Sequence, residues 1–193
     1  MKLKSDFVDY YDYALKDVCE NYTLERFTES GPNKKEQLDL LTPHYPTPYY
    51  GPVHELVSDI ESYKKGYGQW NHSFSTTKIV VYDNQSQHCG EGKRLVYISQ
   101  LKEEDQEKLG CAFVKDGGRK AVSSRHLWIG SAIVVLEYSS DNDWRSNCGD
   151  GDIILTGFNR RFIPGRPFKQ YPLVAIDIVN GYAIDLNIAP GMK

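Results

Sequence analysis

The strongest constraint on the fold of this chain is a pair of apolar segments joined by Asn180-Gly181. The segments run from Val174 to Val179 and from Tyr182 to Ile188. An Asn-Gly pair between two such runs indicates a two-residue hairpin turn, because both central positions of the turn need positive φ. The sequence therefore predicts an antiparallel hairpin with its turn at residues 180 and 181.

Three oxygen-bearing side chains interrupt these strands, namely Asp177, Asp185 and Asn187. Asp185 and Asn187 are two residues apart and share one face of their strand. Regular pairing outward from the turn places Asp177 opposite Ile184, which sets it on the other face from Asp185 unless a β-bulge intervenes. A buried carboxylate needs a cation or hydrogen-bond donors, and oxygen ligands suit Mg²⁺. We therefore expect a compensating positive charge at this hairpin.

The hairpin resembles the metal-binding end of the ATP-grasp enzymes, which couple ATP hydrolysis to the joining of a carboxylate and an amine. The resemblance lies in a strand with Asp, a turn, and a strand that continues acidic-x-Asn-x-x-Pro-Gly, here Asp185 to Gly191. It implies that Asp177, Asp185 and Asn187 bind Mg²⁺ and that ATP and Mg²⁺ are cofactors. An open alternative is a buried hairpin whose Asp and Asn side chains make turn and edge hydrogen bonds.

The same resemblance extends upstream to an apolar strand that begins at Ile133. Glu137 and Tyr138 match the position at which the family presents backbone groups to adenine. Asp143 and Arg145 match a later polar element near the phosphates. The resemblance thus implies that Glu137, Tyr138 and Asp143 bind the cofactor and that Arg145 is catalytic.

Further basic residues are candidates for contacts with the phosphates. Arg161 lies in a segment rich in arginine, and its guanidinium suits bidentate contact with a phosphate, so it is the second candidate catalytic residue. Lys115 precedes a Gly-rich turn and is a candidate cofactor-binding lysine, as is Lys78 by position alone. A solvent-exposed turn and surface arginines are the alternative.

Hydrophobic periodicity predicts helices in the first third of the chain. Apolar residues recur at helical spacing from Phe7 to Tyr22, and shorter helices are expected at Lys34 to Leu41 and Val53 to Tyr63. Four prolines in the Pro- and Tyr-rich segment 42–52 exclude regular structure and predict an extended, polyproline-like track. It is either a packed connection or a loop over a ligand.

From Thr77 onward, apolar runs separated by turn residues predict strands. The expected fold is therefore α+β, with N-terminal helices followed by a mainly antiparallel sheet, and the resemblance implies an ATP-grasp-like C-terminal half. We expect a helical and Pro/Tyr-rich region over residues 1–76 and a sheet region with the nucleotide and metal site over 77–193. The two regions could form one compact domain.

Composition excludes some classes of function. The chain of 193 residues has a formal net charge of −3, so no basic field favours nucleic-acid binding. The four cysteines lack C-x-x-C spacing, which argues against a structural zinc site. The sequence contains no apolar run typical of a signal peptide or a membrane span, so a cytoplasmic protein without a membrane partner is expected.

Three functions remain open at this point. The first is a Mg-ATP-dependent carboxylate-amine ligase of ATP-grasp type, or a minimal relative of one, with a small-molecule or nucleotide partner. The second is a protein that binds a nucleotide or another anionic metabolite without turning it over. The third is a protein-interaction module that uses the Tyr-rich and Pro-rich surfaces. The oligomeric state is left open.

Overall fold

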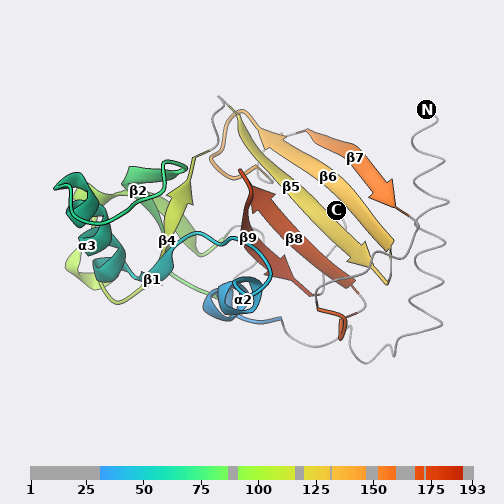
Figure 1. Ribbon diagram of the computed structural model, residues 1–193, viewed down its shortest axis with the longest axis horizontal. Coiled ribbons are helices and arrows are strands. Elements are labelled where there is room, and N and C mark those ends of the chain that lie inside the picture. Colours follow the sequence, from blue (N-terminus) through green and yellow to red (C-terminus); the bar gives the residue numbers. More distant parts are fainter. Residues whose placement is uncertain are drawn as a thin grey trace.

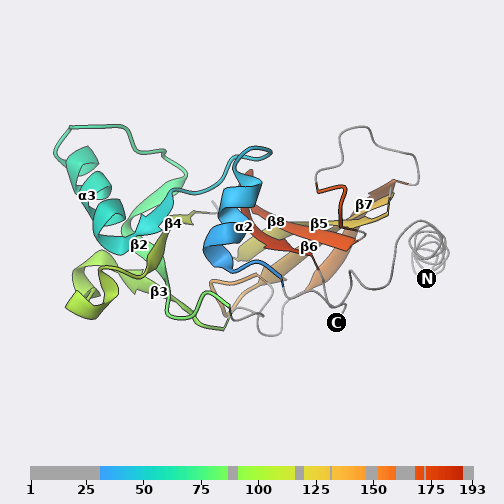
Figure 2. The same ribbon diagram turned by 90° about the horizontal axis from the view of Figure 1, so that it is seen from below.

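Two antiparallel sheets lie side by side, and helix α2 packs where they meet (Figure 1, Figure 2). The computed structural model describes residues 31–86, 91–115, 120–130, 132–146, 152–159, 168–171 and 173–188. The first sheet has the strand order β1-β4-β2-β3 and the second has the order β7-β6-β5-β8-β9. This architecture confirms the predicted α+β fold.

The described residues form two α-helices, two 3₁₀ helices and nine strands. Their bounds are α2 (Lys34–Leu41), β1 (Tyr50–Pro52), α3 (Val53–Lys64), β2 (Phe74–Tyr82), β3 (Lys93–Tyr97), η2 (Ile98–Gln100), η3 (Glu103–Asp105), β4 (Leu109–Val114), β5 (Ala121–Ile129), β6 (Ala132–Ser140), β7 (Ile153–Asn159), β8 (Leu173–Val179) and β9 (Tyr182–Asn187). The expected helices at 34–41 and 53–63 are confirmed, whereas the helix expected between Phe7 and Tyr22 lies outside the described residues.

Helix α2 begins at a capping box. The side chain of Asn33 accepts a hydrogen bond from the Glu36 amide, and the Glu36 carboxylate accepts one from the Asn33 amide. Leu38 packs against the first sheet beside Val80 and Cys111, while Leu41 packs against the second sheet. The helix therefore joins the cores of the two sheets.

Helix α3 covers the opposite face of the first sheet. Val53 and Ile60 are fully buried against strand residues such as Ile79 and Val81. Strand β1 contributes to this sheet by pairing with β4. The prediction that segment 42–52 is irregular is therefore wrong at its end, because Tyr50–Pro52 forms a strand at the edge of the sheet. An edge strand pairs on one side only, so it tolerates Pro52, which has no backbone N–H to donate.

The close contact between α3 and β4 depends on Gly110. A Cβ atom at this position would lie 2.9 Å from Leu56 Cδ1 and 3.0 Å from Val53 Cγ2. We expect Gly110→Ala to lower the free energy of unfolding by about 1–3 kcal/mol, because the helix must move away from the sheet. Urea denaturation measures this change. Gly157→Ala is the matched control, because a Cβ there meets nothing within 4 Å; an equal loss in both variants would contradict the packing argument.

The predicted hairpin is confirmed. Strands β8 and β9 pair on either side of a turn in which Asn180 has a φ of 46° and Gly181 a φ of 82°. Tyr182 follows the turn and packs against Phe74 of β2 with ring centroids 4.8 Å apart. The turn end of the hairpin therefore contacts the first sheet. Among the described residues, no helix is both long enough and apolar enough to cross a membrane.

Candidate functional site

A β-bulge in the terminal hairpin brings its two carboxylates together. Val179 pairs with Tyr182 and Ile178 with Ala183, but Asp177 pairs with Asp185 because the register shifts between Asp177 and Ile178. The extra residue is Ile184. Regular pairing would set Asp177 and Asp185 on opposite faces of the sheet. The bulge instead sets both aspartates on one face.

Arg125 neutralises Asp177. It lies on β5 directly opposite Asp177, and its Nε and Nη2 donate to the two carboxylate oxygens at 2.7 and 2.8 Å. The side chains are 16% and 8% exposed, respectively. Hydrogen bonds from Arg125 to Asp177 raise the pKa of the guanidinium above its usual range, so Arg125 stays charged. Arg125 also packs over Tyr138, with Cζ 4.9 Å from the ring centroid.

Lys34 neutralises Asp185 from the first turn of α2. Its Nζ forms an ion pair with Asp185 and donates to the Ile184 carbonyl at 2.8 Å, and the Lys34 side chain is only 6% exposed. Burial opposes ionisation of Asp185, but Lys34, Lys93 and Arg125 together hold the pKa of its carboxyl below the ordinary value. Asp185 is therefore ionised at neutral pH.

The predicted compensating charge thus comes from two side chains of the chain itself. The proposed Mg²⁺ ligands are only partly gathered, since Asn187 pairs with Ala175 and lies two residues beyond Asp185 on the same strand. Within the described part of the chain, no group of three His, Cys, Asp or Glu side chains is arranged to hold a metal ion. The Mg²⁺ site, which would use two carboxylates and an amide, stays a prediction.

A second group of charges surrounds Trp144, after β6. Lys93 Nζ and Arg145 Cζ lie 5.8 and 5.7 Å from the Trp144 ring centroid. Arg145 also binds both carboxylate oxygens of Asp143, at 2.9 and 2.7 Å, and this contact lowers the pKa of Asp143. Trp144 packs edge-on against Phe113 of the first sheet, so both sheets position this group.

We call these residues the inter-sheet cluster. It comprises four basic side chains, three carboxylates and three aromatic rings, namely Lys34, Lys93, Arg125, Arg145, Asp143, Asp177, Asp185, Tyr82, Tyr138 and Trp144. Lys93 lies within electrostatic range of both groups of charges, because Arg145 and Lys93 lower the pKa of Asp143, and Lys34 and Lys93 lower the pKa of Asp185. The cluster carries one net positive charge.

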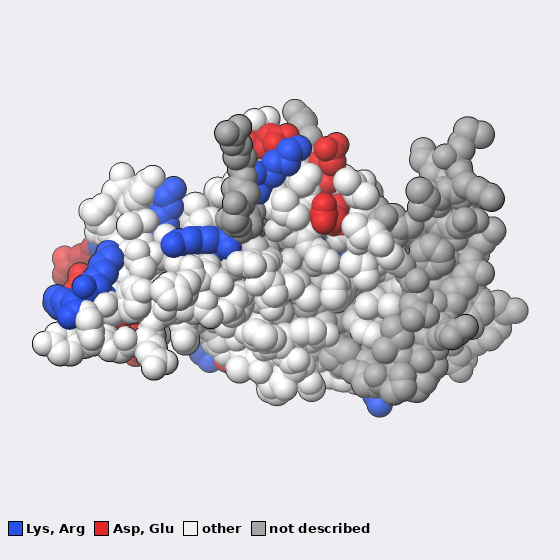
Figure 3. All heavy atoms as spheres, turned by 45° about the horizontal axis from the view of Figure 1, so that its top comes forward, with Lys and Arg blue, Asp and Glu red and all other residues white. Residues whose placement is uncertain are grey.

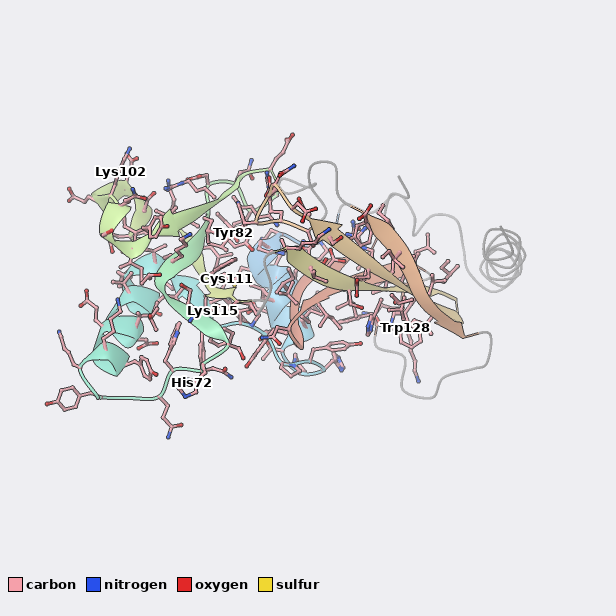
Figure 4. All side chains as sticks on the ribbon, turned by 90° about the horizontal axis from the view of Figure 1, so that it is seen from above. His72, Tyr82, Lys102, Cys111, Lys115 and Trp128 are labelled. Carbon is pink, nitrogen blue, oxygen red and sulfur yellow. The ribbon has the colours of Figure 1, made fainter. Side chains whose placement is uncertain are left out.

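Tyr82 and Cys111, on the side of the cluster formed by the first sheet, carry no charge at physiological pH. Tyr82 and Cys111 lie on the side of the first sheet that faces α2 (Figure 4). Burial raises the pKa of the Cys111 thiol to about 12 and the pKa of Tyr82 well above its usual range. Both side chains are therefore neutral at physiological pH, which excludes Cys111 as a thiolate nucleophile.

The structure separates some of the candidate site residues. Tyr138 lies with Arg125, but its neighbour Glu137 lines a shallow, open groove of about 290 Å³ together with Ser124 and Ile178. Glu137 is paired with Ser124, so alternation along the strand turns it to the opposite face from Tyr138. The predicted adenine position therefore does not bring both side chains to one site.

Two further candidates do not join the cluster in the described structure. Lys115 is exposed at the end of β4, and its carbonyl accepts a hydrogen bond from Asn180 at 3.0 Å. That contact places its backbone at the hairpin turn rather than beside Asp177 and Asp185. Lys78 packs over Tyr97, 4.4 Å from the ring centroid. Arg161 lies outside the described residues.

Sequence reasoning missed three basic residues of the cluster, Lys34, Lys93 and Arg125. Arg125 had only a weak signal, since it stands between Ser124 and His126 and the one apolar run nearby, Leu127-Trp128-Ile129, is short. Lys34 and Lys93 had none, because each stands at the start of its element beside other polar residues. Only the tertiary structure brings them to the hairpin.

Another group of charges lies on the first sheet, where Arg94 and Lys108 each form ion pairs with Asp83 and Asp105. On the face shown in Figure 3, most described atoms belong to uncharged residues, and the Lys and Arg side chains stand as separate groups. Neither the protein-family models nor the curated proteins compared with the chain match it.

Proposed function

We propose that this protein binds a small anionic ligand with a planar ring, of which a nucleotide is the simplest example, at the inter-sheet cluster and without turning it over. The observation that carries the proposal is the pairing of Asp177 with Arg125 and of Asp185 with Lys34. Because the buried Asp177 and the partly exposed Asp185 already have a cation each, neither carboxylate requires a metal ion. A metal-independent binding function follows.

The chemistry around Trp144 suits such a ligand. Lys93 and Arg145 lie on the same indole ring and bring two positive charges next to an aromatic face. A phosphate would be attracted by the net positive charge of the cluster, and a base would stack on an aromatic side chain. Lys93 is the residue we expect to contact the anion, because its Nζ lies 5.8 Å from the centroid of the Trp144 ring on which a base would stack.

The second candidate is the Mg-ATP-dependent ligase of ATP-grasp type. The bulge that sets Asp177 opposite Asp185 favours it, because a Mg²⁺ ion bridging two carboxylates needs both on one face. In that case Asp177 and Asp185 would exchange Arg125 and Lys34 for the metal, and neutralisation of the transferring phosphate would fall to Mg²⁺ and Arg145. Catalysis would then require Mg²⁺ and release ADP or AMP.

Thermal unfolding with ATP, ADP or AMP, each with and without Mg²⁺, distinguishes these functions. We expect the wild type to melt about 5–10 °C higher when a nucleotide is present at a hundredfold its Kd, because binding stabilises only the folded state. The shift should occur without Mg²⁺ and be lost in Lys93→Gln.

Lys102→Gln is the charge-matched control, because Lys102 is 73% exposed outside the cluster, and its shift should equal that of the wild type. A shift that requires Mg²⁺ and disappears in Asp185→Asn would replace the binding proposal by the ligase. A flat response under all conditions would overturn both functions.

A further inference from the structure

Each open sheet has two edges, and the four edge strands here are β1, β3, β7 and β9. An unpaired edge exposes backbone donors and acceptors that can pair with another strand, so proteins usually protect it. The protection differs among the four strands.

The edge at β9 is covered by polar contacts from upstream residues. Lys34 Nζ donates to the Ile184 carbonyl at 2.8 Å, the Leu186 amide donates to Gln37 Oε1 at 3.3 Å, and the Ala183 amide donates to the Pro46 carbonyl at 2.8 Å. These bonds occupy backbone groups that another strand would need. Strand β9 is therefore closed to pairing.

The two edges of the first sheet are protected by length and charge. Strand β1 has only three residues and ends at Pro52, which has no amide hydrogen to donate. Strand β3 begins with Lys93 and Arg94, and Arg94 forms an ion pair with Asp83 at 2.8 Å. Short strands, proline and edge charges are all features that prevent pairing between sheets.

Strand β7 lacks these features. It contains no proline and no charged residue, and its only described partner is β6. Ile153 and Ile154 are 56% and 53% exposed, and as neighbours on a strand they point to opposite faces. The register shift that leaves Thr156 unpaired follows this pair, so residues 153–155 remain regular against β6. Residues 153–155 therefore form an apolar edge with no partner on its outer side among the described residues.

We propose that β7 pairs antiparallel with β7 of a second copy of this chain, as a symmetric dimer. A two-fold axis at Ile154 would set Ile154 opposite its own copy, Ile153 opposite Leu155 and Asp152 opposite Thr156. No like charges meet in this register, and both faces of the new pairing gain apolar contacts from Ile153 and Ile154. A strand without charge offers nothing to attract a charged partner segment, whereas a second copy is matched to it residue by residue.

Sedimentation velocity over a range of protein concentrations, without nucleotide, tests the dimer. We expect a concentration-dependent dimer in the wild type and a dissociation constant at least tenfold higher for Ile154→Lys, which places two like charges opposite each other. Leu40→Lys is the control, because Leu40 is also exposed but lies on α2, and it should dimerise like the wild type.

Two outcomes would overturn the proposal. A wild type that sediments as a monomer at every concentration has no such interface, and a pairing strand from another protein would then be the remaining occupant of the edge. A dimer that is equally strong in Ile154→Lys must form through a different surface. Circular dichroism of the variant confirms that it remains folded, so a monomeric variant can be attributed to the edge.

Discussion

An Arg125→Leu variant is expected to lose about 3–5 kcal/mol of its free energy of unfolding. The substitution leaves the Asp177 carboxylate buried without the guanidinium that binds both of its oxygens. It also leaves Asp185 opposite an uncompensated carboxylate on the neighbouring strand. Urea denaturation at pH 7 measures the loss.

Two companion variants make this result specific. Lys120→Met removes a lysine whose ion pair with Asp141 is exposed, and its stability should stay close to that of the wild type. The double variant Arg125→Leu/Asp177→Leu removes both charges and should regain most of the stability, because apolar side chains replace a buried pair well. If Arg125→Leu lowers the free energy of unfolding no more than Lys120→Met does, the buried Asp177 does not depend on Arg125. The explanation that Arg125 compensates the charge of Asp177 would then be wrong.

The second large effect concerns the first sheet. Asp105 is fully buried. Its carboxylate accepts hydrogen bonds from the Arg94 guanidinium, from the Lys108 ammonium at 2.9 Å and from the Lys102 backbone amide at 3.2 Å. We expect Asp105→Asn to lower the free energy of unfolding at pH 7 by about 3 kcal/mol, since it removes charge-assisted hydrogen bonds from two basic groups.

The loss should depend on pH in a defined direction. Burial opposes the charge of Asp105, but hydrogen bonds and attraction from Lys108, Lys102 and Arg94 lower its pKa from 3.8 to about 2. A carboxyl whose folded pKa is lowered stabilises the protein above its ordinary pKa, and this contribution disappears as the pH falls through about 2. The wild type should therefore lose its advantage over Asp105→Asn between about pH 4 and pH 2.

Urea denaturation at several pH values measures this convergence. Glu104→Gln is the control, because it removes a carboxylate from the same 3₁₀ helix at a position that is 68% exposed. Its stability should follow that of the wild type across the whole range. A constant difference between wild type and Asp105→Asn would show that the effect is one of packing, and not of ionisation.

Local sequence signals predicted the parts of the fold that local chemistry controls. The Asn180-Gly181 turn, the helices α2 and α3, and strands with long apolar runs such as β6 could all be located. Strands β4 and β5 could not, because their apolar residues are mixed with Gly, Ser, Arg and His. Pairing with strands that are distant in sequence stabilises such segments.

The candidate site was also predicted only in part. The sequence indicated that Asp177 and Asp185 need a positive charge, and the resemblance to ATP-grasp enzymes supplied a metal ion as a candidate for it. In the structure the charges come from Arg125, 52 positions before Asp177, and from Lys34, 151 positions before Asp185. No spacing rule relates residues so far apart.

The sequence by itself determined the composition of the elements, the place of the terminal turn and the presence of buried carboxylates, because each depends on residues near one another in the chain. Only the tertiary structure decided how those carboxylates are neutralised and which strand edge lacks a partner among the described residues. The neutralisation depends on the bulge at Ile184 and on the packing of α2 and β5 against the hairpin, whereas the position of β7 at an edge follows from the strand order of the second sheet. Such long-range contacts arise from burial and charge pairing across the whole fold, which a local pattern does not encode.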